Sequence, residues 1–204
     1  MIDLEKELKF MAEEYGISEK RVLNWWRTAV RQMWMKSPFM DAMRKQATYK
    51  IVNTNPRSMK KYPIVPRMKC EKCCQEFSVS DMNLDHIEGN IVLESFADAE
   101  NFMMKILFTP KSNLQWLCDD LQRMRNKKKY TTTIGCHSIK SQIESDPTLS
   151  EKEAWVVREF GRIKKHENIV DKLLSLGVES IPKLKKDQES LLRQLLLEGV
   201  SDEN

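Results

Sequence analysis

Cys70-Glu71-Lys72-Cys73 opens a run of four segments that decides the fold of this chain. The other three are Leu84-Asp85-His86-Ile87, Asn113-Leu114-Gln115-Trp116-Leu117-Cys118 and Cys136-His137-Ser138-Ile139-Lys140. Four thiolates can hold one tetrahedral Zn²⁺, and a small unit with little core of its own gains folding energy from such an ion. The sequence therefore predicts a structural zinc site made by Cys70, Cys73, Cys118 and Cys136.

The composition is that of a globular protein. The chain has 204 residues, of which 41% are hydrophobic, enough for one main domain with helical additions. The formal charge of +4 is small, so the clustering of cations says more about partners than their sum does. No stretch approaches the roughly 18 uncharged apolar residues that a membrane helix needs, and we expect no membrane partner.

The cysteines and the N-terminus indicate a cytoplasmic protein. The segment Met1–Lys6 is charged and lacks the apolar core and small-residue cleavage site of a secretory signal. Four of the five cysteines stand at metal-like spacings, which suits a reducing compartment, and Cys74 is expected to be a bystander.

Helical periodicity dominates both ends of the chain. In the N-terminal part Leu4 and Leu8 share a face, Gly16 ends a helix, Ser18 caps a second helix and Pro38 begins a third. Three tryptophans of the second helix are expected in the core rather than as platforms for stacked bases. They are Trp25, Trp26 and Trp34.

The C-terminal part shows a helix start at Ser150 and Glu153, which together form a capping box, and a helix end at Gly177. A last helix over Gln188–Leu197 is rich in leucine and could dock on the body of the protein or on another copy. We therefore predict a mostly helical α+β protein. Its expected parts are a helical N-terminal region (1–52), a linker (53–67), a central domain (68–146) with a basic insertion (119–135), and a helical C-terminal region (147–204).

The four segments together resemble the HNH nuclease family, which has the ββα-metal fold, in the zinc-bearing version often encoded by tailed bacteriophages. The likeness rests on the Cys-x-x-Cys pair, on Leu84–Ile87, on Asn113–Cys118 and on Cys136–Lys140. It implies a central zinc-stapled ββα-metal motif. If the chain is phage-encoded, the implied compartment is the host bacterial cytoplasm.

One departure from the family concerns the last cysteine and the histidine that follows it. Without a gap, Leu121 and Gln122 would occupy these two places, and the site would be broken. The alternative is an insertion over Asp119–Gly135, after which Cys136 and His137 restore the family's ending. We favour the insertion, because the restored segment matches the family's ending at three positions and then enters a helical pattern, whereas Asp120–Gln122 matches at none. The entropic cost of closing such a loop grows only slowly with its length.

The resemblance also implies roles for individual residues. Asp85 and His137 would bind a catalytic Mg²⁺ or Mn²⁺ ion, His86 would be the general base, and Asn113 would orient the loop of His86. The zinc ion held by the four cysteines would be structural. An alternative left open is that His137 is itself a zinc ligand, with Cys136 or Cys118 idle.

The insertion carries the strongest signal for nucleic acid. Its cations could neutralise backbone phosphates, although most charge runs are simply solvated surfaces. The candidate DNA contacts are Arg123, Arg125, Lys127, Lys128, Lys129 and Lys140.

Two functions of different classes follow. The first is a metal-dependent DNA endonuclease that nicks or cuts duplex DNA. The second is a catalytically silent relative that binds DNA or engages a host or viral protein, an idea motivated by the leucine-rich tail around Leu191–Leu197. The oligomeric state is left open.

Overall fold

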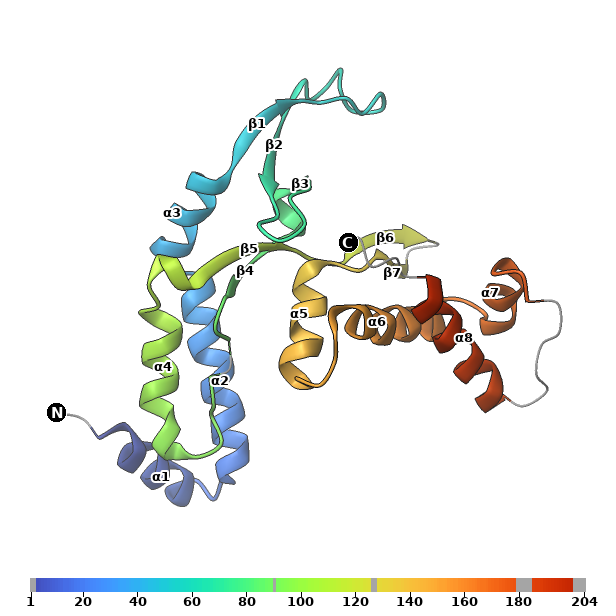
Figure 1. The fold of residues 1–204 in the computed structure, drawn as a ribbon. Helices are drawn as coiled ribbons and strands as arrows, with labels where there is room; N and C mark the ends of the chain where they lie inside the picture. The colour runs from blue at the N-terminus through green and yellow to red at the C-terminus, as the bar shows by residue number, and fades with distance from the viewer. Residues whose placement is uncertain (1–2, 90, 126–127, 179–184, 200–204) are drawn as a thin grey trace. The chain divides into compact units, whose positions relative to one another are not determined.

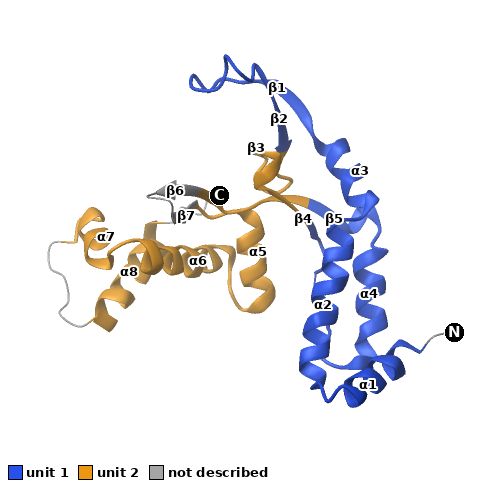
Figure 2. Ribbon diagram, turned by 180° about the vertical axis from the view of Figure 1, so that it is seen from behind, with its two compact units in different colours: residues 1–68, 85–115 blue, residues 69–84, 116–204 orange. Residues whose placement is uncertain are grey.

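The computed structural model describes residues 3–89, 91–125, 128–178 and 185–199. For residues 123–125 and 128–132 the structure describes the backbone but not the side chains. Eight α-helices and several short antiparallel strands lie in the described part, which confirms the mostly helical α+β class (Figure 1). The chain forms two compact units. Unit 1 comprises Met1–Met68 and Asp85–Gln115, and unit 2 comprises Lys69–Leu84 and Trp116–Asn204 (Figure 2).

In unit 1 the predicted end of the first helix and the predicted starts of the second and third helices are confirmed. The helices of this unit are α1 (Leu4–Glu14), α2 (Glu19–Met35), α3 (Pro38–Ala47) and α4 (Ala99–Leu107). Gly16 has a positive φ of 61° directly after α1, and Ser18 is the N-cap of α2. Ser37 caps α3 by accepting a hydrogen bond from the Met40 amide, with Pro38 in the first turn.

The core of unit 1 lies where α2 packs against α4 and α1 crosses both. Its buried apolar side chains include Leu8, Ala12, Val22, Leu23, Val30, Phe102 and Ile106. Trp34 is buried, and the indole of the half-buried Trp26 donates to the Ala99 carbonyl at 3.2 Å. The expectation of a core position is wrong for Trp25, which is 57% exposed.

The strands form three small sheets, with the orders β1-β2-β3, β4-β5 and β6-β7. The strands in the first two sheets are β1 (Tyr49–Val52), β2 (Ile64–Lys69), β3 (Glu76–Ser78), β4 (Met82–His86) and β5 (Leu114–Cys118). Tyr49 of β1 lies opposite Arg67 of β2 in an antiparallel pair, so part of the segment expected as a linker is a strand. Single 3-10 turns cover Val79–Asp81, Phe96–Asp98 and Lys111–Asn113.

The insertion is a β-hairpin. Its strands β6 (Leu121–Arg125) and β7 (Lys128–Thr133) pair antiparallel, with a register shift between Leu121 and Gln122. Lys127 lies outside the described residues.

The remaining helices belong to unit 2. They are α5 (Cys136–Ser145), α6 (Glu151–His166), α7 (Ile169–Ser175) and α8 (Lys185–Gly199). The predicted capping box at the start of α6 is confirmed, and Gly177 has a positive φ of 84° just beyond α7.

A compact apolar cluster holds the last three helices together. Its buried members are Val156, Phe160, Ile163, Leu173, Leu192 and Leu196. The leucine-rich face of α8 therefore packs within unit 2. It no longer supports the idea that this face docks on a partner protein. Across the described residues, no helix has both the length and the apolar character needed to cross a bilayer.

Candidate metal centre

The first half of the site is the turn that connects β2 to β3. Cys70 and Cys73 lie on this turn, which is closed by hydrogen bonds from the Cys74 amide to the Cys70 carbonyl (3.0 Å) and from the Cys70 amide to the Gln75 carbonyl (2.9 Å). Cys74 has a φ of 59° and is the one non-glycine residue with positive φ in the described chain. This left-handed residue directly follows Cys73 and lets the chain turn back into β3.

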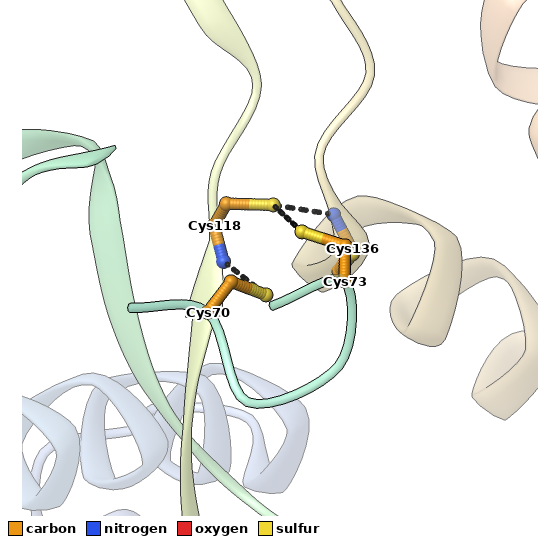
Figure 3. A group of neighbouring side chains, drawn as sticks. All are labelled: Cys70, Cys73, Cys118 and Cys136. Carbon is orange, nitrogen blue, oxygen red and sulfur yellow. Dashed lines mark hydrogen bonds between the residues drawn. The ribbon is translucent and has the colours of Figure 1, made fainter. Parts of the chain in front are cut away.

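The second half comes from β5 and α5. Cys118 is the last residue of β5, and Cys136 is the first residue of α5. Figure 3 shows all four side chains, from the turn, the strand and the helix, gathered at one place. These residues, Cys70, Cys73, Cys118 and Cys136, form the four-cysteine cluster.

The spacing of the sulfur atoms fits a tetrahedral zinc ion. All four sulfurs lie within 4.8 Å of one another, and the Cys73 and Cys118 sulfurs are 3.9 Å apart. Zn–S bonds of ~2.3 Å in a tetrahedron place the sulfurs about 3.8 Å apart. The four-cysteine cluster is therefore consistent with a structural Zn²⁺ site.

Hydrogen bonds to sulfur favour the thiolate of Cys118 in the four-cysteine cluster. The Cys118 amide donates to the Cys70 sulfur at 3.4 Å, and the Cys136 amide donates to the Cys118 sulfur at 3.3 Å. A hydrogen bond from the Cys136 thiol, assisted by the one from the Cys136 amide, lowers the pKa of Cys118 to about 5, although burial opposes the shift. The same bond raises the pKa of the Cys136 thiol, and burial raises the pKa of Cys73. A metal must displace the remaining protons to bind all four sulfurs.

Burial is uneven across the four-cysteine cluster. Cys70 and Cys118 are buried, Cys136 is half-buried and Cys73 is exposed. The exposed Cys74 is outside the cluster. Cys136 completes the set, whereas Leu121 and Gln122, the residues of the ungapped alternative, lie in β6.

The base of the hairpin is closed by Asp120 and Gly135. The Asp120 carboxylate is buried; its Oδ1 accepts from the Gly135 amide at 2.9 Å, and its Oδ2 accepts from two nitrogens of Arg158 at 2.8 and 3.2 Å. These bonds hold the two ends of the insertion together and attach Asp120 to α6, so that Cys136 lies beside Cys118. Sequence reasoning missed Asp120, although its position directly inside the predicted insertion could have suggested a closing role.

His137 has two polar neighbours in unit 2. Its Nδ1 lies 3.4 Å from Asn83 Nδ2 and 4.0 Å from Asp119 Oδ1. The histidine is half-buried at the second position of α5 and is not a member of the four-cysteine cluster. Neither Asn83 nor Asp119 is among the site residues that the sequence predicts. Two features of the sequence could have indicated them. Asn83 lies two residues before Asp85 and therefore on the same face of the strand, and Asp119 directly follows Cys118.

Three other predicted site residues belong to unit 1. Asp85 and His86 end β4, and both are half-buried. Asn113 binds the loop that follows them: its Oδ1 accepts from the Glu88 amide and its backbone carbonyl accepts from the Ile87 amide, each at 2.9 Å. The ring centroids of His86 and Trp34 are 6.3 Å apart, with the planes tilted by 45°. Since His137 belongs to unit 2, the convergence of these residues on one ion stays a prediction.

The candidate DNA contacts are described only in part. Lys140 lies on α5, where its ammonium group forms an ion pair with the Glu144 carboxylate. For Arg123, Arg125, Lys128 and Lys129 only the backbone positions in β6 and β7 are described, and Lys127 is outside the description.

The four-cysteine cluster is thus the metal-binding arrangement that the structure itself brings together. Elsewhere in the described ranges, no further group of three or more histidine, cysteine, aspartate or glutamate side chains converges. No protein-family model, no curated protein and no solved structure matches the chain.

Proposed function

We propose that this protein is a metal-dependent DNA endonuclease with a zinc-stapled ββα-metal motif. One observation carries the proposal: Cys136 joins Cys70, Cys73 and Cys118 across a 17-residue hairpin insertion, Asp119–Gly135. This pairing is the one required for Cys136 and His137 to form the ending of the HNH motif. On the ungapped alternative the motif would have neither its last cysteine nor its histidine.

In the proposed ββα-metal motif, β4 and β5 are the two strands and α5 is the helix. β4 ends in Asp85 and His86, β5 ends in Cys118, and α5 begins with Cys136 and His137. The structural zinc ion would attach the end of β5 to the start of α5. That attachment fixes the backbone position of His137, the next residue on the helix.

Asp85 and His137 are the proposed ligands of a catalytic Mg²⁺ or Mn²⁺ ion. Such hard ions prefer oxygen ligands, so beside the imidazole nitrogen the Asp85 carboxylate, water and phosphate oxygens would supply the rest of the coordination. When bound, the ion supplies Lewis-acid stabilisation of charge on the phosphate and the leaving oxygen. The Asp119 carboxylate, 4.0 Å from Nδ1, supports this role, because a proton held on Nδ1 toward Asp119 would leave Nε2 free for the ion.

His86 is the proposed general base. A neutral imidazole can accept a proton from an attacking water near physiological pH. The loop that follows His86 is held by the two hydrogen bonds to Asn113, which supports a positioning role for this asparagine. The ring of the buried Trp34 lies beside the His86 ring, at a centroid distance of 6.3 Å.

The hairpin insertion is the proposed contact to the DNA backbone. Its register sets Arg123 opposite Tyr130 and Arg125 opposite Lys128. Three cations and an aromatic residue thus occupy two cross-strand pairs of one short ribbon. Contacts of such residues to phosphates give affinity that falls with salt and carries little sequence information.

A cleavage assay with the full zinc-loaded chain tests the proposal. Supercoiled plasmid is incubated with Mg²⁺ or Mn²⁺ and the parent protein, and we expect nicked or linear product. His86→Ala should abolish cleavage while retaining DNA affinity and zinc content. His166→Ala is the matched control, because this third histidine lies at the end of α6, and it should cut like the parent. Absence of cleavage by the parent with either ion, or full activity of His86→Ala, would overturn the proposal.

A further inference from the structure

The first two helices of unit 1 form a helix–turn–helix. α1 ends at Glu14 and α2 begins at Glu19, so four residues connect them. In both views of the fold, α1 lies across one end of α2 (Figures 1 and 2). Two helices that cross steeply and are joined by a turn of three or four residues containing glycine define this motif.

Backbone hydrogen bonds in the turn fix the angle between α1 and α2. The Ile17 amide donates to the Ala12 carbonyl at 2.9 Å, and the Gly16 amide donates to the Glu13 carbonyl at 3.2 Å. With Gly16 at a φ of 61°, these bonds form the Schellman arrangement that ends α1. Ala12 is buried at the crossing, where its small side chain permits close approach, and Val22 is buried on the facing side of α2.

A third helix completes the packing and leaves one face of α2 uncovered. α4 packs on α2 and also contacts α1. The inner face of α2 carries Val22, Leu23, Val30 and Trp34, all buried. The opposite face repeats at helical spacing, and its residues are exposed: Arg21, Asn24, Trp25, Thr28, Arg31 and Gln32.

The exposed face of α2 carries cations and amides without a carboxylate. The single acidic residue of α2 is Glu19, whose carboxylate accepts a hydrogen bond from the Phe96 amide at 3.2 Å. The Arg27 guanidinium donates one hydrogen bond to the Leu93 carbonyl at 2.9 Å and another to Asn24 Oδ1 at 3.0 Å. The second bond orients the Asn24 amide. The acidic residues of α1, among them Glu5 and Glu7, belong to the other helix of the pair.

We propose that α2 is a recognition helix that enters the major groove of duplex DNA and reads base edges through Arg21, Asn24 and Thr28. Arginine matches the acceptors of guanine, asparagine matches adenine, and the threonine methyl group contacts thymine. A positive helix face with these side chains is complementary to the groove in charge and in hydrogen-bonding capacity. This reading helix would give the chain a sequence preference, which the hairpin contacts to phosphate cannot supply.

The proposal is independent of the proposed cleavage. Selection from a random duplex library with the full zinc-loaded chain, in buffer without Mg²⁺ or Mn²⁺, reports sequence preference alone. The parent should enrich one short motif. Recovery of a motif without any plasmid cleavage would overturn only the nuclease, whereas cleavage without an enriched motif would overturn only the recognition helix.

Two variants and one control locate the reading residues. Arg21→Ala and Asn24→Ala should each lower affinity for the selected motif by about tenfold or more, with little change for unrelated duplexes. Lys45→Ala, on the exposed side of α3, should leave both affinities unchanged. Circular dichroism checks that each variant remains folded. If the folded Arg21→Ala and Asn24→Ala variants both enrich the parent motif with parent affinity, the recognition helix is wrong.

Discussion

Gly135 approaches Asp119 so closely that a Cβ atom built on this glycine would lie 2.3 Å from the Asp119 carbonyl carbon. It would also lie 2.5 Å from the carbonyl oxygen of Cys118. Both neighbours are backbone atoms, so a side chain at this position cannot be accommodated by a rotamer change. The hairpin insertion therefore closes beside the four-cysteine cluster only because position 135 is glycine.

Gly135→Ala should destabilise the protein by about 3 kcal/mol, because the backbone at the base of the hairpin must move apart. Zinc retention should fall in the same variant. Gly161→Ala is the matched control: a Cβ there meets no atom within 4 Å, and alanine in the middle of α6 should stabilise by about 0.5–1 kcal/mol. Denaturant unfolding and zinc analysis measure both effects. Equal stability of Gly135→Ala and the parent would contradict the close approach.

Removal of one sulfur ligand should abolish tight zinc binding. We expect one zinc ion per parent chain and less than a tenth of that in Cys136→Ser after dialysis against a weak chelator, because three thiolates leave the tetrahedron incomplete. Metal analysis after gel filtration gives the ratio. A Cys136→Ser protein that keeps its zinc would show that residue 136 is no ligand.

Cys74→Gly should keep the full zinc content and raise the free energy of unfolding by about 1 kcal/mol. Cys74 holds a left-handed backbone conformation, which costs a side-chain-bearing residue roughly this amount and costs glycine little. Denaturant unfolding and zinc analysis measure these two effects. Loss of zinc from Cys74→Gly would mean that the spare thiol takes part in the site.

The Asp120–Arg158 pair should act as the clamp of the hairpin. Asp120→Ala removes a buried carboxylate that accepts from Gly135 and Arg158, and we expect a loss of about 2 kcal/mol. A double-mutant cycle with Arg158→Ala separates the contribution of the ion pair from that of the backbone contact. If the losses of unfolding free energy in the two single variants add up to the loss in the double variant, the Asp120–Arg158 ion pair does not stabilise the base of the hairpin.

The capping box of α6 should give a pH-dependent stability. Hydrogen bonds from the Ser150 hydroxyl and amide lower the pKa of Glu153 below its ordinary value of 4.5. A lowered pKa means that the ionised form stabilises the fold, so the contribution is present above about pH 4.5 and is lost as the pH falls further. Glu153→Gln should therefore be less stable than the parent at pH 7, and the difference should shrink only as the pH falls below about 4.5. A difference independent of pH would argue against the cap.

Local signals in the sequence predict the helices well. Gly16, Ser18 and Pro38 mark helix ends through backbone conformation and capping, which depend on a few neighbouring residues. The Ser150–Glu153 box acts in the same way. The spacing of the cysteines likewise reflects a local turn at residues 70–73 and a tetrahedral ion that needs four sulfurs.

Features that depend on distant contacts could not be predicted in this way. The hairpin strands β6 and β7 are rich in charged residues and threonine, so their sequence lacks the apolar alternation of a buried strand. The pairing of β1 with β2 spans a proline-containing connection that resembles a linker. The leucines of α8 fit a docking face equally well, until packing against α6 and α7 covers them.

The position of the catalytic ion tests the central claim most directly. Crystals of the zinc-loaded protein with duplex DNA and Mn²⁺, measured at the manganese absorption edge, locate this ion by its anomalous scattering. We predict one manganese peak bound by an Asp85 oxygen and a His137 nitrogen, with the His86 ring facing the phosphate. A peak bound by other residues, or an Asp85 and His137 too far apart to share one ion, would contradict the nuclease site.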